Sequence, residues 1–457
     1  MNLILITIDC LRADHLGCLG YPKKTTPNLD YLASKGMLFS QAISTGHMTP
    51  SSFASIFGST FPLMNGGWFD ISKRGITLPQ VLKGHGYHTA AFHSNPWLSS
   101  YFGYQQGFDT FDDGIQKVGH KRLLNKARKL AEKIIGPKGR LADFLSGVSA
   151  TLVTVDYYTK GDELNKKAIA WLQDNPNNFF LWIHYMDAHE PYYQPSQKKF
   201  SPFKRYRHWK LDKKAMDTPH SLLPGEVNEL IDLYDAKISY VDKITASLLR
   251  TLKPNDMSDN TFVVITADHG QQFMEHGNYG HDAGLYDELI HVPLVIAGPG
   301  LKRQLITRQV SLLDLAPTIL DMLKIEKPRA FLGDSLLPLI RGRGTKGGNL
   351  GAISETDIPG DKPRLQENQK RLNANRRVVS FRTGKWKYIH TEGRQDELYH
   401  LEDDPKETQN IIDAQPDIAT ELRAKIMAHI EFEHRSTPGE RESIKARVRK
   451  LKDSGKI

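Results

Sequence analysis

The stretch LILITID, residues 3–9, joins six consecutive apolar or β-branched residues to an aspartate. A short apolar run without polar alternation is typical of a strand that is buried on both faces of a parallel sheet. Segments with helical periodicity separate it from similar runs further along the chain. We therefore predict an α/β domain, with a mostly parallel sheet sandwiched by helices. The other predicted strands are residues 89–93, 179–184, 262–266 and 293–297, and the helices are residues 27–35, 78–85, 162–173 and 230–252.

The character of the chain changes after Gly342, where RGRGTKGGN indicates a flexible joint. We predict a catalytic domain over residues 1–345, a small α+β subdomain over 346–432 and a charged tail over 433–457. The Thr383-Gly384 pair indicates a hairpin turn within the subdomain. Its predicted strands are residues 351–355, 378–382, 385–390 and 397–400, followed by a helix over 418–432.

The 457-residue chain has a globular composition, 39% hydrophobic and 25% charged, with a net charge of +9. The basic excess collects in residues 117–140, 198–214 and 435–456. We favour solvated helices or insertions for these segments over an anionic partner. No nucleic-acid motif is present, so no nucleic-acid partner is expected.

The expected compartment is the cytoplasm. The longest apolar runs are strand-sized, so we expect no membrane span. Residues 1–8 have neither a basic n-region nor a cleavage site, and we expect no signal peptide. The two cysteines, Cys10 and Cys18, suit a reducing compartment better than a disulfide framework.

Polar side chains follow several predicted strands at the point where each strand ends. Asp9 follows the first strand, Asn95 the second, Asp187 and His189 the third, and the Asp268-His269 pair the fourth. Ligands bind at the carboxyl ends of strands in open parallel sheets. Carboxylates with imidazoles suit Mn²⁺, Mg²⁺, Ca²⁺ or Zn²⁺.

The stretch TPSSF, residues 49–53, allows two interpretations. Thr49 before Pro50 fits a helix N-cap followed by the first helical position. A threonine hydroxyl that touches a metal at a helix N-terminus could also be a nucleophile. Taken alone, the stretch favours the plain cap.

Six segments, in this order, resemble the sulfatase-like branch of the alkaline phosphatase superfamily, which includes sulfatases and phosphonate monoester hydrolases. The resemblance covers most of the chain, favours a nucleophilic Thr49 that also caps its helix, and implies the superfamily's α/β fold. The segments are LITIDCLRADHLGCLGY and its continuation (residues 5–44), GYHTAAFHSNP and its continuation (86–113), LWIHYMDAHEPY (181–192), VVITADHGQQF and its continuation (263–300), QVSLLDLAPTILDML (309–323) and GKWKYIHTEGRQDELYHLEDDPKETQNI (384–411).

The sulfatase signature, Cys/Ser-x-Pro-x-Arg, is not matched here. Anchoring on Pro50 places the inert Met48 at the nucleophile. Anchoring on the following helix and on Phe61-Pro62 places Thr49 there and Phe53 at the arginine, and we prefer this register. Threonine cannot be oxidised to formylglycine, so none is expected.

Two further departures lie outside the signature. Cys10 stands where many sulfatases carry a second metal-binding aspartate. The Asp268-His269 pair stands where sulfatases often have Asp-Asn, and Asp-His is commoner in relatives that cleave phosphoesters. These departures point away from formylglycine chemistry and toward phosphorus esters.

The resemblance implies roles for individual residues. His189 is expected to face the leaving group or the nonbridging oxygens, and His281 to contact substrate, with a second metal held partly by His281 left open. The implied metal ligands are Asp9, Thr49, Asp268 and His269.

Four residues are weaker candidates for substrate binding, and each has a structural alternative. The alternatives are a salt bridge for Arg12, a turn for Asn95, a helix cap for Asp187 and a turn histidine for His276. Asp14 and His15 are interpreted as structural.

The leading hypothesis is a metal-dependent hydrolase that cleaves phosphate or phosphonate esters through Thr49. Three alternatives stay open: a sulfuric ester hydrolase, transfer of the phospho group to an alcohol, and a non-catalytic binding protein. The expected partner is a small-molecule, glycan or lipid ester, and a homo-oligomer also stays open. We expect substrate specificity to depend on three segments whose sequences do not indicate a substrate, namely residues 114–155, 194–224 and 357–377.

Overall fold

The main sheet holds nine strands in the order β10-β2-β9-β6-β1-β5-β3-β4, with β11 paired to β2. The computed structural model describes residues 1–64, 71, 75–114, 158–174, 177–192, 202–252, 257–281, 284–342, 351–358 and 376–436. The strands are β1 (Asn2–Ile8), β2 (Met37–Ile43), β3 (His88–Phe92), β4 (Thr110–Asp112), β5 (Phe179–Tyr185), β6 (Thr261–Ala267), β9 (His291–Ala297), β10 (Gln304–Ile306) and β11 (Val310–Ser311).

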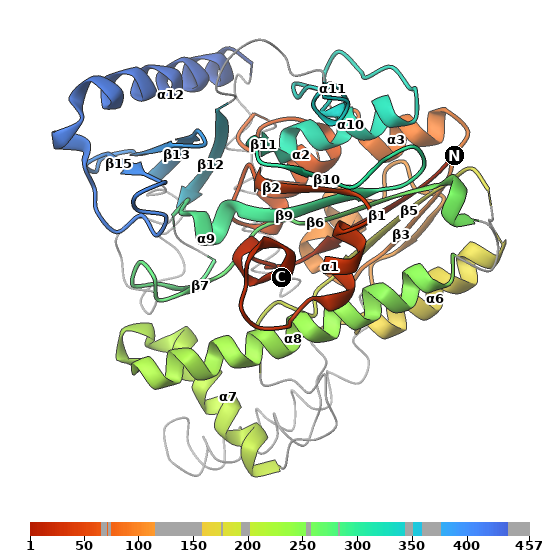
Figure 1. Cartoon of the computed structure of the whole chain (residues 1–457), viewed down its shortest axis with the longest axis horizontal. Coiled ribbons are helices and arrows are strands. Elements are labelled where there is room, and N and C mark those ends of the chain that lie inside the picture. The colour runs from red at the N-terminus through yellow and green to blue at the C-terminus, as the bar shows by residue number, and fades with distance from the viewer. Residues whose placement is uncertain are drawn as a thin grey trace.

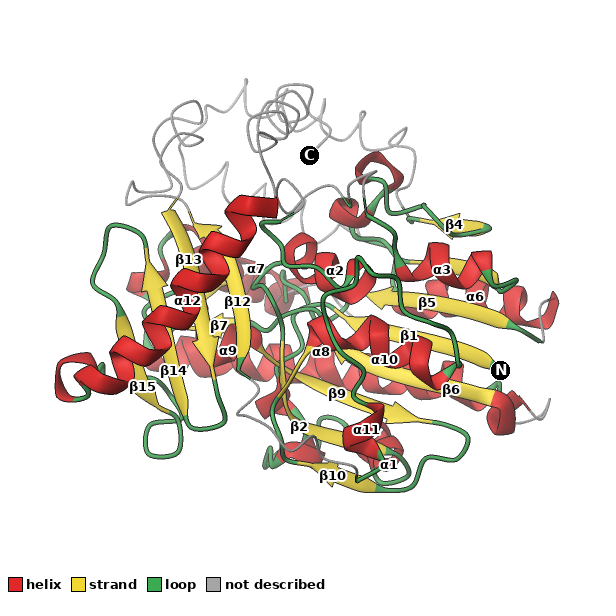
Figure 2. Ribbon diagram, turned by 90° about the horizontal axis from the view of Figure 1, so that it is seen from above, coloured by secondary structure: helices red, strands yellow, loops and turns green. Residues whose placement is uncertain are grey.

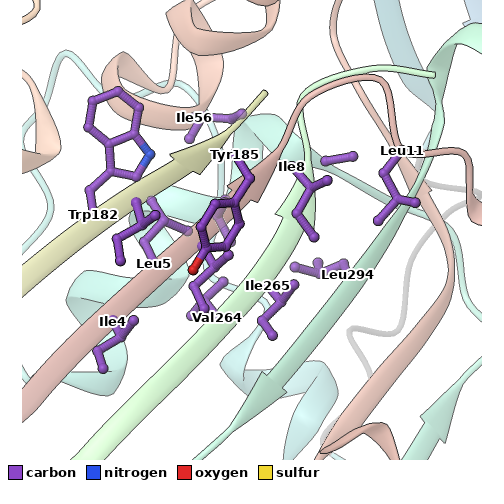
Figure 3. Close-up of a cluster of buried hydrophobic side chains, with 14 of the residues drawn as sticks. Ile4, Leu5, Ile8, Leu11, Ile56, Trp182, Tyr185, Val264, Ile265 and Leu294 are labelled. Atoms are coloured by element: carbon purple, nitrogen blue, oxygen red, sulfur yellow. The ribbon is translucent and has the colours of Figure 1, made fainter. Parts of the chain in front are cut away.

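Strand β1 lies at the centre of the sheet, parallel to β5 on one side and β6 on the other. All seven of its residues are buried, which explains why its sequence shows no polar alternation. Its side chains pack with Trp182, Val264 and Leu294 from neighbouring strands and with Ile56 from α2 (Thr49–Gly58) (Figure 3). Burial of each Leu or Ile side chain contributes roughly 1.5–3 kcal/mol to the free energy of folding. This packed layer therefore holds in place the residues that directly follow the central strands.

Two features of the sheet differ from the prediction. β9 was expected to be parallel, but it runs antiparallel to both β6 and β2. The described residues between β6 and β9 form the short elements β7 (Gln272–Phe273), β8 (Tyr279–Gly280) and α9 (Asp287–Ile290), and none of these is a long crossover helix. The chain therefore re-enters the sheet from the edge that it left. β2 was not predicted, because Ser40 and Gln41 interrupt its apolar run where its pairing with β9 shifts register.

Helices cover both faces of the sheet, as predicted (Figure 1). On one face lie α1 (Pro27–Ala33), α6 (Gly161–Asp174) and α8 (Pro224–Arg250), and on the other lie α2, α3 (Leu78–Gly84) and α10 (Leu315–Met322), with α11 (Leu337–Ile340) beside α10. The remaining described α-helix of this part is α7 (Pro202–Asp217), which falls in the basic segment 198–214. Every helix in the described ranges is too short or too polar to cross a bilayer.

A separate four-stranded antiparallel sheet follows, made of β12 (Ala352–Ile358), β13 (Arg376–Arg382), β14 (Trp386–Thr391) and β15 (Glu397–His400). The helix α12 (Pro416–Ser436) crosses one face of it (Figure 2). Thr383 closes the predicted hairpin turn, with its N–H donating to the Trp386 carbonyl at 2.7 Å. The predicted boundary at residue 345, the basic segment 117–140 and nearly all of the tail lie outside the described residues.

A buried charge cluster connects the two sheets. Asp287, at the start of α9, accepts three hydrogen bonds from two nitrogens of Arg382 on β13 at 2.7–3.1 Å and one from Lys387 on β14 at 2.9 Å. The Lys387 side chain is fully buried and also pairs with Glu407 at 2.7 Å. Two cations and two carboxylates therefore compensate one another inside the protein, so the small sheet and the α9 segment are held together by charge as well as by packing.

We predict that Asp287→Asn destabilises the protein by about 3–5 kcal/mol, because it leaves buried cations undercompensated. Urea unfolding would measure the change. The matched control is Asp232→Asn, which removes an exposed partner of Lys23 at 2.7 Å and is expected to cost at most about 1 kcal/mol. Equal effects of the two substitutions on the free energy of unfolding would contradict the prediction that Asp287 holds the α9 segment to the small sheet.

Candidate metal centre and active site

The candidate site lies at the carboxyl ends of the central parallel strands, where α2 begins. Asp9 directly follows β1, and Asp268 and His269 directly follow β6. The β1–β6 register pairs Ile8 with Ala267. Asp9 and Asp268 are the next residues after this pair, so they lie side by side at the ends of the two strands. The sheet alone therefore brings Asp9 and Asp268 together.

Thr49 completes a compact group with these residues. Its Oγ1 lies 3.2 Å from Asp9 Oδ2 and 3.4 Å from His269 Nε2. His269 Nε2 lies 3.6 Å from Asp9 Oδ1 and 3.6 Å from Asp268 Oδ2. The four predicted metal ligands thus converge on one point.

Thr49 does not cap α2, contrary to the prediction. The helix begins at Thr49 itself, and its N-cap is Met48, whose backbone is extended. Ser51 provides the cap interaction, because its Oγ accepts the Met48 N–H at 3.2 Å. The Thr49 hydroxyl is therefore not engaged in capping and points at Asp9 and His269.

The electrostatics of the group fit a divalent cation. Burial and the charge of Asp9 raise the pKa of Asp268. Burial opposes ionisation of Asp9, but the charge of the neighbouring His189 and the hydrogen bond from His184 hold the pKa of Asp9 well below its usual range. Asp268 Oδ2 is buried and has no hydrogen-bond partner among the described residues. Two adjacent buried carboxylates, one with an oxygen that has no hydrogen-bond partner, are costly unless a cation compensates them. These features therefore suit a cation site.

Surrounding residues fix the orientation of these ligands. His269 Nδ1 lies 2.9 Å from the Gly270 carbonyl, which can only accept, so the proton is on Nδ1 and Nε2 presents its lone pair to the group. Asn95 donates from Nδ2 to Asp9 Oδ2 at 2.9 Å and to Thr49 Oγ1 at 3.3 Å. This places Asn95 in the site, as predicted, although its Oδ1 also accepts the Trp97 N–H in a turn.

A cavity of about 270 Å³ opens onto Thr49 and Asn95. His189, Glu190 and His281 also line it. Burial opposes protonation of His189, but Glu190 and Asp9 raise the pKa of its imidazole to about 9. The structure therefore brings both predicted catalytic histidines to the same cavity as Thr49.

The structure places three predicted substrate-binding residues elsewhere. Arg12 is buried in hydrogen bonds to Asp14 at 2.7 and 2.9 Å and to Glu275 at 2.5 Å. Asp187 Oδ2 accepts the Gly161 N–H at 3.0 Å at the start of α6, as a helix cap would.

His276, the third of these, stacks on Tyr286 with a centroid distance of 3.6 Å. It also contacts Glu288 at 2.7 Å. None of the three lines the cavity. His15, interpreted as structural, contacts Asp235 at 2.8 Å, which fits that interpretation.

Sequence reasoning missed three members of the site. His184 Nε2 lies 3.2 Å from Asp9 Oδ2, and His184 was counted only as a strand residue. A signal was available, since a histidine that ends a fully apolar strand projects toward the sheet edge where ligands bind. Glu190, which directly follows His189, was also missed. Cys10, which directly follows Asp9, was noted as a departure from the family's second aspartate but was not predicted as a site residue. Cys10 has a left-handed backbone (φ 59°), and its Sγ lies 3.1 Å from Asp9 Oδ1.

Candidate metal ligands at the strand ends of an α/β sheet, beside a cavity, are an arrangement typical of metal-dependent enzymes. The family model described as Sulfatase matches residues 1–325, more than half of the chain. The chain belongs to the sulfatase family.

Curated relatives agree with this assignment. The uncharacterised sulfatase YidJ of Escherichia coli K12 is 25% identical over 440 residues, covering 90% of this chain and 83% of that protein. Mouse arylsulfatase K is 25% identical over 467 aligned positions, covering 94% of this chain and 79% of that protein.

Solved structures share the fold. A phosphonate monoester hydrolase of Agrobacterium radiobacter superposes with a TM-score of 0.72 at 21% identity, covering 94% of this chain and 96% of that one. A sulfatase of Bacteroides thetaiotaomicron gives 0.70 at 21% identity, covering 95% and 94%. The chain is thus an ester hydrolase of a metal-dependent family.

We predict that Mn²⁺ or Zn²⁺ raises the melting temperature of the protein, because an ion at 100 times its Kd contributes about 2.7 kcal/mol. Asp268→Asn removes a ligand and is expected to abolish or strongly reduce the shift. His276→Gln, outside the cavity, is expected to keep it. Calorimetry with and without the ion would decide, and a full shift in Asp268→Asn would contradict the assignment of Asp268 as a ligand.

Proposed function

We propose that the chain hydrolyses phosphate or phosphonate esters, with Thr49 as the nucleophile. The observation that carries the proposal is the position of Thr49 Oγ1, which faces the cavity and lies 3.2 Å from Asp9 and 3.4 Å from His269. A divalent ion held by Asp9, Thr49, Asp268 and His269 would lower the pKa of the Thr49 hydroxyl and neutralise charge on the transferring group.

The residues around Thr49 supply the rest of the chemistry. Its hydroxyl donates to Asp9 Oδ2 at 3.2 Å, and this carboxylate oxygen would accept the proton as the threonine oxygen attacks. Attack of the oxygen on phosphorus forms a phospho-threonine and releases the leaving oxygen. His189, protonated at neutral pH and lining the same cavity, donates a proton to that oxygen. Water then releases the phosphate or phosphonate from Thr49.

The start of α2 favours an anionic group in the cavity. Met48, Thr49 and Pro50 line it, so the positive end of the ten-residue helix faces the substrate. The Asn95 amide, which donates to Asp9 and Thr49, holds the nucleophile in place. A cavity of about 270 Å³ suits the phosphoester group of a small molecule or a terminal group of a glycan, which we propose as the substrate class.

Position 53 supports phosphorus over sulfur chemistry. In the preferred register it corresponds to the arginine of the sulfatase signature, but here Phe53 is fully buried. Its ring lies 5.3 Å from Phe57 and 5.3 Å from Trp182. A threonine nucleophile with no arginine nearby in the helix is suited to transfer through a phospho-threonine rather than through formylglycine.

Sulfate-ester hydrolysis is the second candidate, and its support is the likeness to arylsulfatase K. Transfer of the phospho group to an alcohol would use the same Thr49 intermediate. The cytoplasmic location stays a prediction.

We predict that Thr49→Ala lowers kcat on aryl phosphates and phosphonates by roughly 10³–10⁶-fold, because it removes the attacking atom. Thr49→Ser, which keeps a hydroxyl, is expected to retain most of the activity. The same assays also use aryl sulfates as substrates and alcohols as acceptors. Bound metal is measured for each variant. Activity on sulfates alone, or full activity in Thr49→Ala, would overturn the proposal.

A further inference from the structure

A groove of about 730 Å³ lies at the other end of the central strands from the candidate site, and we call it the amino-end groove. Met1, which precedes β1, and Phe262, near the start of β6, line it. Asp9 and Asp268 follow the opposite ends of the same two strands. A strand of seven residues spans roughly 20 Å, so this groove is separate from the cavity at Thr49.

The amino-end groove has an apolar lining that comes from four segments of the chain. Met37 at the start of β2, Phe262, Met322 at the end of α10 and Ile340 at the end of α11 contribute to it. Their side chains are between 3% and 8% exposed. A hydrocarbon group placed against them would be removed from water, which is favourable in proportion to the apolar area buried. The volume falls in the range of small-molecule sites.

The charged side chains that line the groove are all cationic. They are Lys302, Lys324 and Arg341, and all three residues are exposed. None of the described residues that line the groove is an aspartate or a glutamate. An anionic group bound there would therefore meet only attractive charges from the lining, whereas a cationic group would be repelled.

Two other kinds of occupant fit these observations less well. A second copy of the chain, docked across a twofold axis, would bring the three cations close to the same cations of its partner. A bilayer presents a flat surface, but apolar residues of the lining such as Met37 and Phe262 are nearly fully buried. A small molecule that can enter the groove fits both the apolar lining and the charge.

We propose that the amino-end groove binds a single-chain amphiphile with an anionic head, of the fatty-acid class. The carboxylate pairs with Lys302, Lys324 and Arg341, and the guanidinium of Arg341 can bind both of its oxygens. The hydrocarbon chain lies against the apolar lining. Binding is reversible and non-covalent, and it does not depend on the chemistry proposed for Thr49.

The test is calorimetric titration of the full chain with dodecanoate. We expect one molecule to bind per chain. The affinity is expected to increase from octanoate to decanoate to dodecanoate, by up to about fourfold for each added methylene. Acetate, which lacks the chain, and dodecyltrimethylammonium, which has the opposite charge, are expected not to bind.

The double variant Lys324→Gln/Arg341→Gln locates the site, because it removes two of the three cations at exposed positions where folding is not at risk. It is expected to weaken dodecanoate binding at least about tenfold. Arg329→Gln is the matched control, since it removes an exposed cation that does not line the groove, and it is expected to keep the affinity. The titration needs no turnover, so failure of the catalytic proposal leaves this readout intact.

Three results would overturn the proposal. The first is no binding of dodecanoate, or equal binding by the natural chain and the double variant. The second is a dimer that the double variant alters, measured by sedimentation, because it would assign the groove to a second copy. The third is binding to vesicles of anionic phospholipid that the double variant loses, because it would assign the groove to a membrane surface.

Discussion

The proximity of two buried carboxylates, Asp9 and Asp268, is the constraint on which the rest of the site depends. They extend adjacent central strands whose register makes them neighbours, and both are fully buried. Two such charges repel strongly in a low-dielectric interior and require a cation or a proton between them. His184, Asn95 and Thr49 all contact Asp9, so the site is built outward from this pair.

The small C-terminal sheet contributes to the site without lining the cavity. The segment between β6 and β9 carries His281, and the subdomain contacts it at several points. Glu407 accepts the Asp287 N–H at 2.6 Å, and its own carbonyl contacts His276 Nε2 at 3.1 Å. Arg382 on β13 and Lys387 on β14 both form ion pairs with Asp287. His276, expected to bind substrate, is thus part of the contact between the His281 segment and the C-terminal subdomain.

The sequence predicted the central strands and four of the metal-centre residues, because buried strands and the polar residues that follow them are local patterns. It did not predict the direction of β9, since direction depends on how the chain returns to the sheet. His184 was missed because it was counted as the last residue of the predicted strand 179–184, although a histidine at that end of a strand points to the edge of the sheet where ligands bind. The capping role of Thr49 was wrong for a local reason: Ser51, two residues later, accepts the N-cap N–H.

The burial of Phe53 has a consequence for how this chain is related to formylglycine-dependent sulfatases. Its ring is enclosed by Phe57, Trp182 and Tyr104, and it also touches His184. An arginine at this position would place an unpaired charge in that aromatic core, at a cost of several kcal/mol. Under the proposal that Thr49 is the nucleophile, exchanging that residue alone would leave position 53 unable to accept an arginine. Accommodating one would require α2 to repack against Trp182 on β5, so the stability of the core constrains which residues can stand beside Thr49.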